Sequence, residues 1–121
     1  MFDTNRFYVV FLDGLGLWGA SKPSDGLARK FPVYSYYDMV HLNYRLLRDH
    51  LKIGQVVLAT GVSMGGTQSY YWGLMYPDFV KAVLPVGGAS ATDGTGGQIA
   101  AWTFQLAKAS LESDPVWIDT K

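Results

Sequence analysis

The chain contains no cysteine, which excludes disulfide scaffolds and cysteine-based metal sites. An excess of either charge is also missing: the formal net charge is zero. The sequence therefore has no excess of positive charge that would favour binding to nucleic acid or to an anionic membrane surface. The spacing H-E-x-x-H is absent too. We accordingly expect no metal and no nucleic-acid partner.

Long apolar runs are lacking as well. No run approaches the roughly 20 residues that a helix needs to span a bilayer. The N-terminal MFDTNRFYVVFL has one basic residue, a short apolar stretch and no small-residue cleavage site after it. It therefore does not predict a secretory signal. We expect a soluble, cytoplasmic protein with no membrane partner.

The first third of the chain predicts a strand, a long loop and a helix. Residues 7–12 (FYVVFL) are aromatic and β-branched, which favours a buried strand. Residues 13–31 are rich in Gly, Ser, Lys and Pro and predict a loop. Ser35 and Asp38 resemble a capping box, and the following helix should end at Gly54. Its apolar face comprises Val40, Tyr44, Leu47 and Leu51, widened by Met39, Leu42 and Leu46.

The rest of the chain continues the alternation. Residues 55–60 predict a second strand, residues 67–76 a helix stopped by Pro77, and residues 81–86 a third strand with Pro85 near its end. A Gly-rich loop over 87–97 precedes an amphipathic helix over 99–113. This order predicts an α/β fold with a parallel sheet and helices on its faces. Three strands would leave two open sheet edges, which invite pairing with another strand.

The segment Gly61-Val62-Ser63-Met64-Gly65 fits G-x-S-x-G, the nucleophile elbow. A serine on a sharp strand-to-helix turn has strained backbone, and Gly61 and Gly65 would let strand and helix approach. Ser63 is then the predicted nucleophile. The backbone N–H of Met64 would face the oxyanion, helped by the positive end of the following helix. The alternative is an ordinary tight turn with a helix-capping serine.

A second glycine motif suggests a different function, dinucleotide binding. Gly14 to Gly19 match G-x-G-x-x-G after a predicted strand, with Asp38 about 20 residues on. In a dinucleotide site the third glycine opens a helix. Here Pro23 and Gly26 follow and break any helix. A loop at the carboxyl end of a strand, facing the active site, fits better, and nucleotide binding is kept only as a weak alternative.

The partners of a serine nucleophile are harder to find. The base is normally a histidine that follows the serine in this fold. No histidine follows Ser63; His41 and His50 both precede it. His41, in the first turn of its helix, is the less favoured candidate base, and a solvated surface histidine is the favoured reading. Four aspartates follow Ser63. Asp78, directly after Pro77, is interpreted as a turn residue, and Asp93, Asp114 and Asp119 have no histidine to orient.

These residues together resemble the homoserine O-acetyltransferase-like branch of the α/β-hydrolases. The resemblance rests on FDTNRFYVV, SKPSDGL, FPVYSYYDMV, LLRDHLKI, GVSMGG, WGLMYPDFVKAVLPV and LESDPVW. It implies the central part of an α/β-hydrolase core over residues 1–95 and the beginning of a helical lid over 96–121. It also implies that the upstream oxyanion loop and the triad acid and histidine are absent. Thr67 departs from the family, which often has methionine there.

Three functions follow as hypotheses. The first is acyl transfer through an acyl-enzyme on Ser63, with hydrolysis of a small ester or thioester as the expected reaction. The second, implied by the resemblance, is transfer from acetyl-CoA as cosubstrate to homoserine; no other cofactor is expected. The third is a catalytically incomplete fragment with a structural or oligomeric role, pairing as a homodimer or through its sheet edges.

Overall fold

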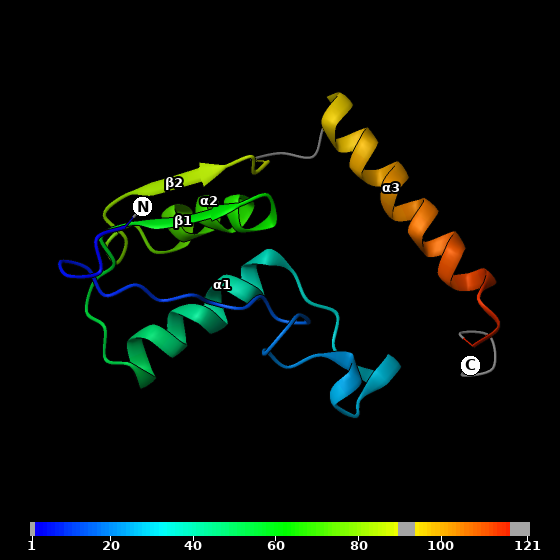
Figure 1. The fold of residues 1–121 in the computed structure, drawn as a ribbon, viewed down its shortest axis with the longest axis horizontal. Helices are drawn as coiled ribbons and strands as arrows, with labels where there is room; N and C mark the ends of the chain where they lie inside the picture. The colour runs from blue at the N-terminus through cyan, green and yellow to red at the C-terminus, as the bar shows by residue number, and fades with distance from the viewer. Residues whose placement is uncertain (1, 90–93, 117–121) are drawn as a thin grey trace. The chain divides into compact units, whose positions relative to one another are not determined.

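The computed structural model describes residues 2–89 and 94–116 (Figure 1). The chain divides into two compact units, Met1–Gly88 and Ala89–Lys121, which are described separately. The second unit contains α3, Gly94–Ser113. The elements of the first unit, in chain order, are the 3-10 turns η1 (Pro23–Asp25) and η2 (Ala28–Lys30), the helix α1 (Tyr36–Arg45), the π-helical turn η3 (Leu46–His50), β1 (Ala59–Val62), α2 (Met64–Met75) and β2 (Val83–Val86).

The sheet of the described residues consists of β1 and β2, which pair in parallel. An isolated parallel bridge between Val56 and Val80 precedes the ladder. The helix α2 connects the two strands and packs against both (Figure 1). This β–α–β unit confirms the predicted α/β fold with a parallel sheet. Pro85 lies in β2 opposite Gly61, one residue before the strand ends, as predicted.

The predicted strand over residues 7–12 is wrong as secondary structure. This segment forms no ladder with either strand of the described part of the chain. Its apolar pattern was nevertheless informative, because Val10 and Leu12 pack against the core while Phe11 is exposed. The prediction of a buried segment was therefore right for these two residues only, since Phe7 and Tyr8 are exposed as well. A strand also needs a neighbouring backbone to pair with, and the composition of the segment does not supply one.

The start of α1 follows the predicted capping box. The Ser35 backbone N–H donates to Asp38 Oδ2 at 2.8 Å, and the Asp38 N–H donates to Ser35 Oγ at 3.4 Å. The Ser35 hydroxyl also donates to Asp38 Oδ2 at 2.7 Å. These hydrogen bonds, the one from the Ser35 side chain first, hold the pKa of Asp38 below its ordinary value. Two residues therefore satisfy the first free donors of the helix.

The end of this helix differs from the expectation. The helix widens into η3, where the Leu51 N–H reaches the Leu46 carbonyl at 3.0 Å. The chain then turns at Lys52, which has a φ of 56°, and not at Gly54. A positive φ is less favourable for lysine than for glycine, so the helix-ending signal in the sequence favoured Gly54, and the turn at Lys52 was not predicted.

The core of the first unit lies where α1, α2 and the chain after α2 meet. Its buried members are Val40, Leu47, Trp72, Phe79 and Val80. Val40 has no exposed surface. Tyr44 packs against this cluster, as the predicted apolar face requires, whereas Leu42, Leu46 and Leu51 remain partly exposed.

The second unit consists mainly of α3, which begins at Gly94, five residues before the predicted helix, and ends as expected at Ser113. Its described side chains are exposed, including Trp102, Phe104 and Leu106. Among the described residues, no helix is both long and apolar enough to cross a membrane.

We predict that Val40→Ala lowers the free energy of unfolding by about 1.5–3 kcal/mol, because it removes buried methyl groups and leaves a cavity. The matched control is Val33→Ala, since Val33 is fully exposed and should change stability by less than about 0.5 kcal/mol. Urea unfolding of the full chain measures both. Equal losses for the two variants would contradict the assignment of the core.

We also predict a pH-dependent loss for Asp38→Asn. Because the folded pKa of Asp38 is lowered, its charged form stabilises the helix above about pH 4, and this contribution disappears as the pH falls through the folded pKa. Unfolding curves at pH 6 should therefore separate the variant from the parent chain, and curves near pH 2 should not. A gap that is the same at both pH values would refute this role of the carboxylate.

Candidate active site

Ser63 lies at the turn between β1 and α2, as an elbow requires. It is the N-cap of α2, with φ 55° and ψ −114°. A positive φ is costly for a residue with a side chain and persists only where the surroundings hold it. The Ser63 N–H donates to the Val86 carbonyl at 2.8 Å, and its own carbonyl accepts from the Thr67 N–H at 3.0 Å. The strained serine is thus fixed to the end of β2 and to the first turn of α2.

The close approach of strand and helix depends on Gly61. A Cβ at Gly61 would lie 2.6 Å from the carbonyl carbon of Gly65 and 2.7 Å from its Cα. A Cβ at Gly65 would meet no atom within 4 Å among the described residues. The motif therefore has one strict steric requirement here, at Gly61. Gly65 supplies the backbone against which Gly61 packs, and its own lack of a side chain is not required by this contact.

A second glycine contact, which the sequence motif does not predict, joins Gly66 to Gly88, each of which stands in a pair of consecutive glycines. A Cβ at Gly66 would lie 2.8 Å from the Gly88 nitrogen and 2.8 Å from the Val86 oxygen, and a Cβ at Gly88 would collide with the Gly66 backbone. The first turn of α2 therefore lies directly against the chain that leaves β2. The paired glycines in GVSMGG and PVGG are the sequence signal that could have revealed this contact.

The backbone N–H of Met64 remains available at the start of α2. Among the described residues no acceptor is bonded to it. The first N–H groups of a helix have no partner within the helix and carry its positive end. This donor follows Ser63 directly, in the position expected of an oxyanion donor.

The glycine-rich loop lies beside the elbow. A Cβ at Gly14 would be 3.4 Å from Met64 Cε and 3.7 Å from Gln68 Nε2, so the loop contacts the first two turns of α2. This agrees with a loop that faces the active-site edge. Gln68 was not singled out from the sequence, because a polar residue on a helix carries no motif of its own.

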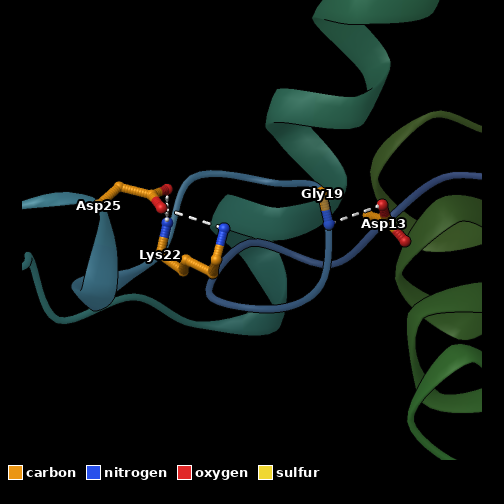
Figure 2. A network of polar contacts seen from close by, with 4 residues as sticks. All are labelled: Asp13, Gly19, Lys22 and Asp25. Carbon is orange, nitrogen blue, oxygen red and sulfur yellow. Dashed lines mark hydrogen bonds and ion pairs between the residues drawn. The ribbon is translucent and has the colours of Figure 1, made fainter.

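The same loop uses four of its own backbone N–H groups internally. Gly16 donates to the Ser21 carbonyl at 2.8 Å, and Gly19 donates to Asp13 Oδ2 at 3.1 Å (Figure 2). Leu17 and Ala20 donate to carbonyls of the loop as well. The next element is the short turn η1 and not a long helix. The dinucleotide alternative therefore lacks its helix, and two glycines of its motif have N–H groups that are already bonded.

His41 lies too far from Ser63 to act as its base. Its Nδ1 is 2.6 Å from the hydroxyl of Tyr76, which is the C-cap of α2, whereas Ser63 is the N-cap. The 12 residues between them rise about 18 Å, which the tyrosine side chain does not cover. The ring of His41 also stacks between Tyr37 and Tyr76. His41 is the sixth residue of α1 and so not in its first turn, whereas Tyr36 at the start of α1 packs on Tyr71, nearer the Ser63 end of α2. The expectation that placed His41 in the first turn, near the active-site edge, is therefore corrected.

The phenol that holds His41 is itself constrained. Burial first, and then the neighbouring Tyr37 and Tyr44, raise the pKa of Tyr76 above its ordinary value. Tyr44 stacks on Tyr76 with ring centroids 3.9 Å apart. A protonated phenol in this stack is a structural partner for His41.

The remaining titratable candidates give no triad among the described residues. His50 lies in η3 and is exposed. Asp114 belongs to the second unit, where its Oδ1 accepts from the Val116 N–H at 2.8 Å. Asp93 and Asp119 lie outside the described residues. Within residues 2–89 and 94–116 no cluster of His, Asp or Glu could hold a metal ion.

Known proteins resemble this chain along most of its length. The homoserine O-acetyltransferase of Carboxydothermus hydrogenoformans is 32% identical over 96% of the chain, and that of Methanocorpusculum labreanum is 36% identical over 95%. The chain covers 31% and 24% of these relatives, respectively, so it spans a third or less of their length.

Comparison with solved structures and family models agrees with this. The crystal structure of an acetylester hydrolase from Corynebacterium glutamicum matches 71% of the chain, and 24% of its own length, with a TM-score of 0.60 and 31% identity. The family model of the alpha/beta hydrolase fold matches residues 2–115. The parallel sheet, the elbow and these matches agree: the chain belongs to the α/β hydrolase fold family, in its homoserine O-acetyltransferase-like branch.

Proposed function

We propose that Ser63 is the nucleophile of an acyl-transfer reaction. Its hydroxyl attacks the carbonyl of a small ester or thioester, the alcohol or thiol leaves, and the acyl group remains on Ser63 until an acceptor takes it. The observation that carries this proposal is the backbone of Ser63 at φ 55°, at a strand-to-helix turn beside the free N–H of Met64. An ordinary capping serine needs no such strain, because N-cap residues are normally extended.

We take hydrolysis as the expected reaction, because water needs no binding pocket of its own. The acetylester hydrolase from Corynebacterium glutamicum supports an acetyl ester as the substrate class. The relatives named homoserine O-acetyltransferase support the alternative, in which acetyl-CoA donates the acetyl group and homoserine accepts it. Both alternatives use the same first step on Ser63 and differ only in what removes the acyl group.

The turnover of esters by this chain alone should be slow. Neither histidine of the chain is placed to take the proton of Ser63, so the described residues offer an elbow and one oxyanion donor. Enzymes that lose their triad partners retain roughly 10³–10⁴-fold acceleration over water from binding and oxyanion stabilisation. We therefore expect acylation by activated reagents and little turnover of ordinary esters by this chain alone.

A specific observation favours one second candidate, a structural role through strand pairing. The side of β1 that does not face β2 has no partner strand in the described part of the chain, and Val62 at its end is 71% exposed. Free strand edges recruit further strands. A second copy of the chain or another polypeptide would then complete the sheet, with Ser63 inert.

The first test is labelling of the full chain by a fluorophosphonate, followed by intact-mass measurement. We expect one adduct, lost in Ser63→Ala and retained in Ser24→Ala, since Ser24 is an exposed serine of the 3-10 turn η1. His41→Phe should label at the parent rate, because His41 contacts Tyr76 and not the elbow.

Two other outcomes would contradict the proposal. An oligomer by light scattering whose Ser63 stays unlabelled would favour the structural role. Rapid turnover of an unactivated ester that His41→Phe abolishes would mean that His41 reaches Ser63 after all.

The second test compares two glycines of the motif. Gly61→Ala places a methyl group against the backbone of Gly65, so we expect it to cost about 1–3 kcal/mol of stability and to abolish labelling of Ser63. Gly65→Ala meets no atom within 4 Å and should label nearly as the parent chain does. Urea unfolding and the labelling rate together provide the readout. Equal behaviour of the two variants would show that the strand–helix approach does not control the serine.

A further inference from the structure

The hydrogen bond between Tyr76 and His41 sets Tyr76 apart from the other tyrosines. Its hydroxyl oxygen lies 2.6 Å from Nδ1 of His41. All eight tyrosines of the chain belong to the part that the structure describes. Among the described residues, no other tyrosine hydroxyl has a hydrogen-bond partner. Tyr76 is therefore the one tyrosine in this part of the chain that has a base beside its proton.

The phenol of Tyr76 is the donor of this hydrogen bond. Burial first, and then Tyr37 and Tyr44, raise the pKa of Tyr76 above its ordinary value near 10, so the hydroxyl keeps its proton at neutral pH. A neutral imidazole with its proton on Nε2 accepts hydrogen bonds at Nδ1. The proton of Tyr76 is thus aimed at a nitrogen that is able to take it.

The ring of Tyr76 is also in contact with other electron-rich rings. Tyr44 stacks on it with ring centroids 3.9 Å apart and planes inclined by only 5°. The indole of Trp72, which is buried in the core, has its centroid 5.8 Å away. These contacts are short enough for an electron to pass between the rings. A positive charge that forms on Trp72 or Tyr44 is therefore able to move to Tyr76.

The composition of the chain makes this arrangement matter. The chain has no cysteine, so no thiol competes with its aromatic side chains for a one-electron oxidant. A phenol that loses an electron becomes a strong acid, and a base at hydrogen-bond distance stabilises the product by taking the proton at once. His41 is exposed and Tyr76 is half-buried, so a small oxidant in water has access to the pair.

We propose that Tyr76, with His41 as its proton acceptor, is the preferred site of one-electron oxidation of this chain by organic peroxyl radicals. The peroxyl radical takes one electron from Tyr76 and becomes a hydroperoxide anion, while the phenolic proton moves to Nδ1 of His41. The imidazolium then returns a proton through water to the hydroperoxide anion. The products are a hydroperoxide, a neutral tyrosyl radical and a neutral histidine. This site is separate from the serine chemistry proposed above and does not depend on it.

The test exposes the full chain to peroxyl radicals from a water-soluble azo initiator at neutral pH. A tyrosyl radical combines with a second peroxyl radical, and the new carbon–oxygen bond leaves an adduct that peptide mass mapping locates. We expect Tyr76 to carry about three- to ten-fold more adduct than Tyr8, because a hydrogen bond favours its oxidation. Accessibility alone predicts the reverse, since Tyr8 is 82% exposed.

Variants separate the base from the hydrogen bond and from the stacked ring. His41→Phe keeps a ring between Tyr37 and Tyr76 but removes the acceptor, and should lower the adduct on Tyr76 by about three- to ten-fold. His41→Asn keeps an acceptor oxygen that does not take a proton, and should lower it as much. His50→Phe changes the other histidine, which has no tyrosine partner among the described residues, and should match the parent chain.

Three results would overturn the proposal. Adduct that follows exposure, with most of it on Tyr8, would mean that the hydrogen bond does not direct the oxidation. Full retention of adduct on Tyr76 in His41→Asn would mean that no proton is transferred to His41. Equal losses in His41→Phe and His50→Phe would mean that neither histidine acts through its contact with Tyr76.

Discussion

The contact between Gly61 and Gly65 is the constraint on which the site depends. It brings the end of β1 and the start of α2 so close that no side chain fits between them. The residue in the turn must then adopt a left-handed backbone, and in this chain that residue is Ser63. The strain is held by ordinary interactions: a hydrogen bond from Ser63 to the end of β2, and the packing of Gly66 against Gly88. Strain of this kind persists only when its surroundings over-determine it.

The same geometry explains both what the elbow offers and what it lacks. Because α2 starts directly after Ser63, the N–H of Met64 has no acceptor among the described residues and lies at the positive end of a helix, which favours negative charge. A base must reach Ser63 from another element. The candidate base from the sequence, His41, is held by Tyr76 at the opposite end of α2. The length of α2 therefore separates Ser63 from that histidine.

Sequence reasoning succeeded where local chemistry decides the structure. The capping box of Ser35 and Asp38, the stop of α2 before Pro77 and the elbow itself each depend on residues within a few positions of one another. The predictions from sequence were wrong where the structure depends on backbone far along the chain. Residues 7–12 have the composition of a strand but no strand to pair with in the described part of the chain, and composition does not reveal whether a partner strand exists.

The residues of the candidate site show the same difference between local and distant contacts. Ser63, Met64 and Gly61 were found from a five-residue motif whose sterics are local. Gly66, Gly88 and Gln68 were not, because their importance lies in contacts with segments far along the chain. His41 was misplaced because α1 begins at Tyr36, which puts His41 in the second turn of the helix and not in its first. A side-chain bond 35 residues away, to Tyr76, was required to place it.

The loop of residues 13–21 connects these findings, because it lies between the start of α2 and α1. Four of its backbone N–H groups donate to acceptors within the loop, and these hydrogen bonds hold it in one conformation. On one side Gly14 lies against Met64 at the elbow. On the other side Asp13 and Ser21 line a small cavity together with Asn43 of α1. Internal hydrogen bonds thus give a segment without helix or strand a defined position beside the elbow, and because three of these four bonds join backbone groups, the composition of the loop did not predict them.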